Sequence, residues 1–190
     1  MVTVLVLGAV LVGAFIIRQG VMMDIHYTQL LDVIAEGESK GNYNAYFGKA
    51  HNTAIDFTSM PVGDVLAWQR KFVADGNASN AVGRYQFIEP TLSGLVNEMG
   101  IDPDERFTPG LQDKLAVRLL ERRGIREYMQ GRLSREDFAH NLSKEWAALP
   151  RVIGDQSQSS YYSGDGLNHA QITVKDVFVA IESLHDTDES

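Results

Sequence analysis

The sequence predicts a mainly α-helical (α+β) domain in which a small β or loop element lines a cleft. Apolar residues recur at the three- and four-residue spacing of an amphipathic helix in six segments, whereas only two short segments alternate as a strand does. The chain has 190 residues, of which 44% are hydrophobic and 22% charged, and this is the balance of an ordinary globular domain. Such a chain buries a sizeable core and leaves irregular segments to line a cleft.

Six helices are predicted from their apolar stripes and end signals. The stripes consist of Tyr27, Leu30, Leu31 and Ile34; Val62, Val65, Leu66, Gln69 and Phe72; Leu92, Leu95, Val96 and Met99; a segment that starts at Pro109; Phe138, Leu142 and Trp146; and Val174, Val177, Phe178, Ile181 and Leu184. Gly100 stops the third helix and Gly124 the fourth. Thr108, Ser134 and Thr173 are the expected N-caps of the last three helices.

Two short segments, residues 55–58 and 83–88, alternate apolar and polar side chains and are predicted to be short strands. From Asp24 onward the chain has no repeat, no low-complexity tract and no long Pro/Gly linker. We therefore expect residues 24–190 to form one monomeric domain of ordinary size.

Charge and composition exclude several classes of function. The net charge of −8 and the lack of a Lys/Arg stripe interleaved with aromatics argue against a nucleic-acid partner. The chain has no cysteine, and its five histidines never approach a His-x-x-x-His pairing. We therefore expect neither a metal ion nor another cofactor.

Residues 1–23 are predicted to be separate from this domain. Residues 2–17 form an uncharged apolar run that Arg18 ends, which predicts a membrane anchor or an export signal because the run has no polar face. The run is shorter than the roughly 20 residues that comfortably span a bilayer, so its length does not settle which of these it is. It fits an uncleaved anchor, a releasable signal-anchor or a cleaved signal. We expect the full chain to fractionate with membranes and a chain that starts near Asp24 to be soluble.

Glu38 is the first candidate for catalysis. At about 100° per residue, it falls on the same helix face as Tyr27, Leu31 and Ile34, whereas Glu36 lies on the opposite face. A carboxyl group beside apolar side chains has a raised pKa, so that it stays protonated near neutral pH and can protonate a leaving oxygen. The alternative is a solvated carboxylate at a frayed helix end, and periodicity alone favours it.

The run Glu-Ser-Lys-Gly-Asn-Tyr-Asn-Ala that begins at Glu38 is similar to the Glu-Ser-x-Gly-Asn-x-Asn-Ala run of lytic transglycosylases and goose-type lysozymes. In these families the Glu is the catalytic acid, and the resemblance implies that role for Glu38. It also implies that Ser39 supports the carboxyl by hydrogen bonding, that Gly41 permits the turn into the cleft, and that Asn42 and Asn44 fix the loop through side-chain to backbone bonds. Loops also gather Ser, Gly and Asn without any catalytic role.

A second run, Gly-Arg-Tyr-Gln at residues 83–86, resembles the corresponding segment of lambda-phage-type endolysins. The resemblance implies that Arg84, Tyr85 and Gln86 bind substrate in the cleft. Gln86 would bond a sugar amide or hydroxyl, and Tyr85 would offer a ring face or support the wall. An ordinary half-buried strand has the same alternation.

The run Trp-Ala-Ala-Leu-Pro that begins at Trp146 resembles the Trp-Ala-Ser-Leu-Pro run of the same endolysins. Because Trp146 follows Phe138 and Leu142 at intervals of four residues, we expect it to pack in the core beneath the cleft. Tyr161 and Tyr162 lie where these endolysins have a Tyr-containing loop. One of the two is expected to reach the reacting sugar, and the sequence leaves open which.

The resemblance runs in order from Tyr27 to Leu184 and places the chain in the lysozyme superfamily. It implies a lysozyme-like fold and an enzyme that cleaves the MurNAc-β-1,4-GlcNAc bond of peptidoglycan, as a muramidase or a lytic transglycosylase. The implied partner is the glycan strand, with the bacterial inner membrane contacted through residues 2–17. The implied location is the membrane, the periplasm or the cell wall, and a phage origin fits the endolysin likeness.

A hydrolase usually needs a second carboxylate, and Asp56 is the best candidate because it follows the Glu38 loop in a strand-like segment. Asp64 is better explained as a helix-dipole partner in the first turn after Pro61. A transglycosylase needs only one carboxyl, and the endolysin likeness favours that chemistry. The alternatives are an inactive lysozyme-fold module for wall binding or virion structure, against which Glu38 argues, and an anchored wall-remodelling enzyme with the same chemistry.

Overall fold

The computed structural model describes residues 27–188, and the predicted anchor segment, residues 1–23, lies outside that range. Within the described range no helix is long and apolar enough to cross a membrane. The first helix spans residues 27–39. It is followed by η1 (Phe57–Ser59), α2 (Val62–Ala74), α3 (Glu89–Met99), α4 (Pro109–Arg122), α5 (Ile125–Met129), α6 (Arg135–Ser143), α7 (Val174–Glu182) and η2 (Ser183–Asp188). The mainly α-helical prediction is confirmed.

The helix ends follow from local sequence. The hydroxyls of Thr108, Ser134 and Thr173 each accept a hydrogen bond from a backbone amide three residues further on, as an N-cap does. Gly100 ends α3 in the left-handed conformation with φ 62°. Gly124, at φ 100°, ends the turn after α4 and directly starts α5, a five-residue helix that the sequence did not predict.

The two predicted strands are not present. Within residues 27–188 the structure has only isolated β-bridges, and the segment predicted at 55–58 instead enters η1. Between Val82 and Phe87, which form a bridge, the chain makes a tight turn with positive φ at Gly83 (80°) and Gln86 (50°). The burial of Tyr85 and Phe87 therefore comes from a turn and not from an extended strand.

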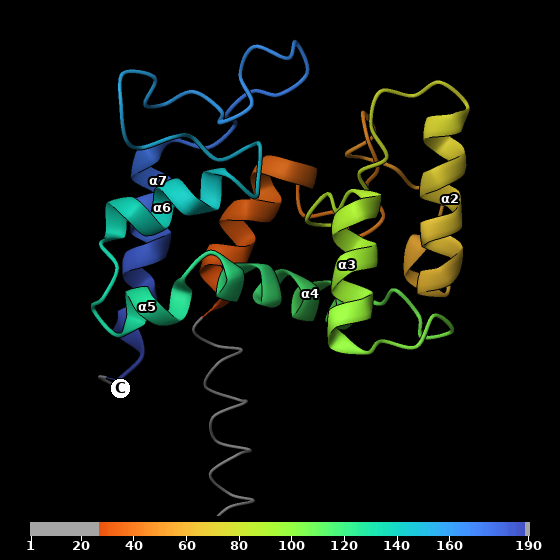
Figure 1. Ribbon diagram of the computed structural model, residues 1–190, viewed down its shortest axis with the longest axis horizontal. Coiled ribbons are helices and arrows are strands. Elements are labelled where there is room, and N and C mark those ends of the chain that lie inside the picture. Colours follow the sequence, from red (N-terminus) through yellow and green to blue (C-terminus); the bar gives the residue numbers. More distant parts are fainter. Residues whose placement is uncertain (1–26, 189–190) are drawn as a thin grey trace, which may run out of the picture.

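The helices form two groups with α4 between them (Figure 1). In one group α6 packs against α5 and α7; in the other α2 packs against α3. A single hydrophobic core runs through both groups, and its largest members are Trp146, Tyr85, Phe57, Phe87, Phe107 and Phe138.

Trp146 has the core position that was predicted, with 2% of its surface exposed. It does not lie on the same helix as Phe138 and Leu142, as the four-residue spacing predicts, because α6 ends at Ser143 and Trp146 lies in the irregular segment that follows. Its backbone amide still bonds to the carbonyl of Leu142, 3.0 Å away, so that the ring is held close to the helix end.

Candidate active site

A cavity of about 690 Å³ joins the end of the first helix to segments far away in the sequence. Its walls are formed by Gly37 and Glu38, residues 46–50, Ser79 and Ala81, residues 85–88, Thr91, Leu119 and Arg123, residues 144–148, Tyr162, residues 167–169 and Gln171. Such a volume, lined by aromatic and polar groups, is in the range of small-molecule and sugar-binding sites.

Glu38 lies in this cavity at the last turn of the first helix. Its Oε1 accepts a hydrogen bond from the backbone N–H of Ala148, 2.9 Å away. Burial raises the pKa of Glu38 from 4.5 to about 7, and the Ala148 bond lowers it by a smaller amount. Glu36 behaves as the opposite face predicts: its side chain is 62% exposed and pairs with Lys40.

The first helix approaches the Ala148 segment closely at Gly37. A Cβ at this position would lie 2.7 Å from the Cβ of Ala148 and 2.9 Å from Cγ1 of Ile172. Only a residue without a side chain fits this contact, and the contact brings the Glu38 carboxyl within reach of the Ala148 amide.

The loop after Glu38 is fixed by asparagine side chains, as predicted. Gly41 turns the chain at φ 77°. Asn42 donates through Nδ2 to the carbonyls of Ala50 (2.8 Å) and Asn52 (3.0 Å) and accepts through Oδ1 from the amide of Asn44 (2.9 Å). The Asn44 Oδ1 accepts from the amide of Thr58, 2.9 Å away.

Asn52 is a loop residue that sequence reasoning missed. Its side chain is buried, donates to the carbonyls of Asn44 (2.6 Å) and Ile55 (2.8 Å), and accepts from the amides of Ala54 and Ile55. A single Asn in a polar stretch carries no pattern that distinguishes it from a surface residue.

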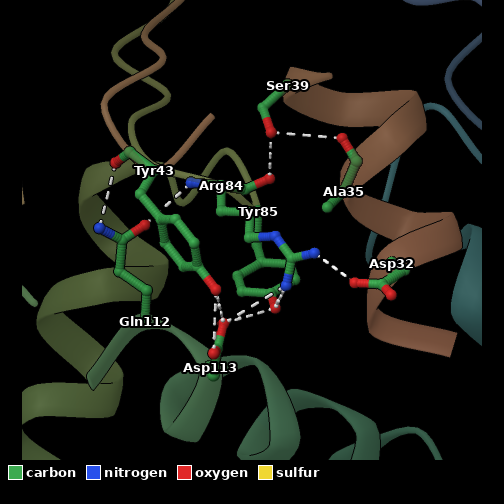
Figure 2. A network of polar contacts seen from close by, with 8 residues as sticks. All are labelled: Asp32, Ala35, Ser39, Tyr43, Arg84, Tyr85, Gln112 and Asp113. Atoms are coloured by element: carbon green, nitrogen blue, oxygen red, sulfur yellow. Dashed lines mark hydrogen bonds and ion pairs between the residues drawn. The ribbon is translucent and has the colours of Figure 1, made fainter. Parts of the chain in front are cut away.

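Ser39 does not have its predicted role. It is fully buried, and its hydroxyl donates to the carbonyls of Ala35 (3.2 Å) and Arg84 (2.7 Å) instead of to the Glu38 carboxyl (Figure 2). It therefore cannot contact substrate. Ser39 joins the end of the first helix to the turn that carries Gln86.

Arg84 is likewise turned away from the cavity, and the prediction that it binds substrate is not supported by its position. Its guanidinium donates to Asp32 and to the Tyr85 hydroxyl, 2.7 Å away, and lies 3.6 Å from Asp113 (Figure 2). The hydroxyls of Tyr43 (3.0 Å) and Tyr85 (2.7 Å) both donate to Asp113. This network connects the first helix, the loop after it, the 83–86 turn and α4.

Gln112 completes the connection to α4. Its Oε1 accepts from the backbone amide of Arg84 (2.9 Å), and its Nε2 donates to the carbonyls of Tyr43 and Phe107, each 3.1 Å away. Sequence reasoning missed Gln112 and Asp113. Gln112 is a buried polar position within the apolar face of α4, which periodicity alone treats as an interruption of the stripe, and the partly exposed Asp113 has no such signal.

Tyr85 and Gln86 do lie at the cavity wall. Tyr85 is 1% exposed, so it supports the wall and offers no ring face to a ligand. Gln86 donates through Nε2 to the carbonyl of Gly83, 2.9 Å away, and lines the cavity from the tip of its turn.

The structure distinguishes the two tyrosines of the late loop. Tyr162 lines the cavity, and its hydroxyl donates to the carbonyl of Lys144, 2.7 Å away. Tyr161 is not among the lining residues; its ring contacts those of His140 and Tyr162 and lies beside the Arg151 guanidinium.

Asp56 does not meet Glu38. It is exposed, lies outside the cavity lining and accepts a 2.5 Å bond from the Thr58 hydroxyl, which lowers the pKa of the Asp56 carboxyl. The second carboxylate of the cavity is Glu145, which sequence reasoning missed, and it pairs with Arg123 at 2.7 Å. Within residues 27–188 no group of three or more His, Cys, Asp or Glu side chains is arranged to hold a metal ion.

One comparison with known proteins gives a match. A family model described as Endolysin matches residues 25–167, which is most of the chain. The matched range includes Glu38, the turn at 83–86, the segment 144–148 and Tyr162. No curated protein and no solved structure gives a significant match.

Proposed function

The chain belongs to the endolysin family, phage enzymes that degrade the peptidoglycan of the cell wall, and on that premise we propose that it cleaves the MurNAc-β-1,4-GlcNAc bond with Glu38 as general acid. One observation carries the proposal. A carboxyl group with a pKa of about 7 lies in the cavity, where a leaving oxygen could meet it.

In the first step Glu38 transfers its proton to the glycosidic oxygen while the bond from that oxygen to C1 of the muramic acid breaks. The carboxyl has a proton to give because burial raises its pKa and keeps it protonated up to about pH 7. The carboxylate that remains is stabilised by the Ala148 N–H, which already points at Oε1 in the ground state.

In the second step the 6-hydroxyl of the same muramic acid attacks C1 and gives its proton to the Glu38 carboxylate. The products are a 1,6-anhydro end and a free 4-hydroxyl end, no water is consumed, and Glu38 is protonated again. A single carboxyl serves as acid and then as base. This route is lytic transglycosylation.

The arrangement of carboxylates favours this route over hydrolysis. A hydrolase usually needs a second carboxylate as base or nucleophile. Asp56 lies outside the cavity, and Glu145 is occupied by its ion pair with Arg123. In this proposal Gln86 and Tyr162, which line the cavity, bind the sugar from the wall.

Mass spectrometry of digested, purified peptidoglycan tests the proposal. We expect muropeptides that are lighter by one water molecule than the products of a hydrolase, and a release by Glu38→Gln that is lower by about 10² or more. Wall binding without any released product would instead support an inactive wall-binding module, and fully hydrated reducing ends would support a muramidase.

A further inference from the structure

The segment 144–148 connects Glu38 to a partly buried ion pair. Its last residue, Ala148, donates its amide to the Glu38 carboxyl. Its first two residues, Lys144 and Glu145, are both bonded by the guanidinium of Arg123, which itself lines the cavity. No part of the proposed reaction uses Arg123.

Arg123 supports this segment from the end of α4. It follows α4 directly, and its backbone amide bonds to the carbonyl of Leu119, 3.0 Å away. Its side chain donates through Nε to Glu145 Oε2 (2.8 Å), lies at 2.7 Å from the same oxygen through NH2, and donates to the Lys144 carbonyl at 3.4 Å. Because Glu145 is only 12% exposed, solvent screens this pair less than a surface pair.

The remaining contacts of the segment come from α6 and from the late loop. The amides of Glu145 (2.9 Å) and Trp146 (3.0 Å) donate to the carbonyl of Leu142 in α6, and the Trp146 ring is buried in the core. The Tyr162 hydroxyl donates to the Lys144 carbonyl, and the amides of Gln171 (2.8 Å) and Ile172 (3.2 Å) donate to the Ala148 carbonyl. The late-loop contacts fix only carbonyl groups, whereas Arg123 also binds the Glu145 side chain and joins the segment to the end of α4.

We propose that Arg123, together with Glu145, is a positioning residue that holds the Ala148 amide against the Glu38 carboxyl. The inference rests on the proposed function of Glu38. Arg123 does not meet the reacting atoms; it acts through the segment 144–148, and it sets both the direction of the carboxyl and the stabilisation of its ionised form.

The two partners of the ion pair give this proposal a sharp test. If Arg123 and Glu145 influenced Glu38 only through their charges, loss of the cation would raise the pKa of Glu38 and loss of the anion would lower it. If they position the Ala148 amide, either loss weakens the same hydrogen bond, and both raise that pKa. The two explanations therefore differ in sign for Glu145.

The experiment is an NMR titration of the Glu38 side-chain carboxyl carbon in the wild type, Arg123→Met and Glu145→Gln. We expect both variants to move the midpoint upward, by up to about one pH unit for Arg123→Met, a tenfold change in proton affinity. In steady-state assays on soluble glycan fragments, kcat should fall roughly tenfold with KM nearly unchanged. Arg123→Lys, which keeps the charge but not the two-point contact, should lie between the wild type and Arg123→Met.

Arg126→Met is the matched control, since Arg126 pairs with Glu121 near the same end of α4 but is 63% exposed. It should leave the midpoint and kcat unchanged. Opposite shifts for Arg123→Met and Glu145→Gln, a downward shift in both, or a raised KM at an unchanged midpoint would overturn the positioning role. The titration needs no activity, so it stays decisive even if Glu38→Gln proves active and the proposed function fails.

Discussion

The backbone amide of Ala148 and the side chain of Glu38 are 110 residues apart in the sequence and 2.9 Å apart in the structure. The bond lies beside the close contact between Gly37 of the first helix and the segment after α6. Ala148 and Ile172 leave no room there for a side chain at position 37. Burial raises the pKa of Glu38 to about 7, and in the proposed reaction the Ala148 amide would stabilise the carboxylate that forms when the proton leaves.

Glu38→Gln should reduce wall lysis by about 10² or more, the usual scale of general acid catalysis. The glutamine side chain keeps the volume of the glutamate but cannot transfer a proton to the leaving oxygen. A turbidity assay on bacterial cell walls measures the effect. Glu36→Gln on the exposed face is the control and should lyse walls like the wild type. Normal lysis by both variants would refute the assignment.

The pH dependence of lysis should report the protonated form of Glu38. Because the pKa of Glu38 is raised to about 7, activity should decline as the pH rises through that value. Glycan cleavage measured at constant ionic strength from acid to alkaline pH would reveal this limb. A limb near pH 4 to 5 would mean that the catalytic carboxyl is solvated and is not Glu38.

The same shift affects stability, with a definite sign. Between pH 4.5 and about 7 the folded protein binds a proton at Glu38 that the unfolded chain has already lost, so the free energy of unfolding falls as the pH rises through this window. The total is on the order of 3 kcal/mol. Glu38→Gln removes this dependence, and urea denaturation should show it to be more stable than the wild type at pH 8 but not at pH 4.

The features that were predicted correctly from sequence depend on residues that are close together in the chain. The azimuth of Glu38, the three N-caps and the turn at Gly41 all follow from residues within a few positions of one another. The hydrogen bonds of Asn42 and Asn44 also begin in local turn chemistry.

What was missed is non-local. Tyr43 and Asp113 are 70 residues apart, and no periodicity links them. The family likeness placed Ser39 and Arg84 in the right segments but could not give the direction of their side chains. Both side chains bond to residues behind the cavity wall: Ser39 to the Arg84 carbonyl and Arg84 to the Tyr85 hydroxyl. The segment around Tyr85 has the alternating burial of a strand but is a turn, with positive φ at Gly83 and Gln86 that the alternation does not reveal.

Trp146 and Gln86 should separate stability from turnover. Trp146→Ala removes a large core side chain and should lower the free energy of unfolding by about 3 to 5 kcal/mol. Gln86→Ala loses its bond to the Gly83 carbonyl, at about 1 kcal/mol, and should weaken turnover by roughly 3- to 10-fold through a lost sugar contact. Denaturation and glycan cleavage measured on both variants decide this, and the reverse pattern would mean that the two roles are exchanged.

Gly37→Ala tests the close approach that brings Glu38 and Ala148 together. The added methyl group would lie 2.7 Å from the Cβ of Ala148, so the helix end and the 147–148 segment must separate. We expect a loss of about 1 to 3 kcal/mol of stability, as for an overpacked core, and a fall in lysis because the carboxyl and the amide move apart.

Gly94→Ala is the matched control for that variant. Gly94 lies within α3, and a Cβ there meets nothing within 4 Å. Alanine should therefore stabilise the protein by about 0.5 to 1 kcal/mol through helix propensity and leave lysis unchanged. Thermal unfolding and wall lysis of both variants give the comparison. If Gly37→Ala were as stable and as active as Gly94→Ala, the first helix could not be in contact with the 147–148 segment, and the bond between Ala148 and Glu38 would not support the chemistry proposed for it.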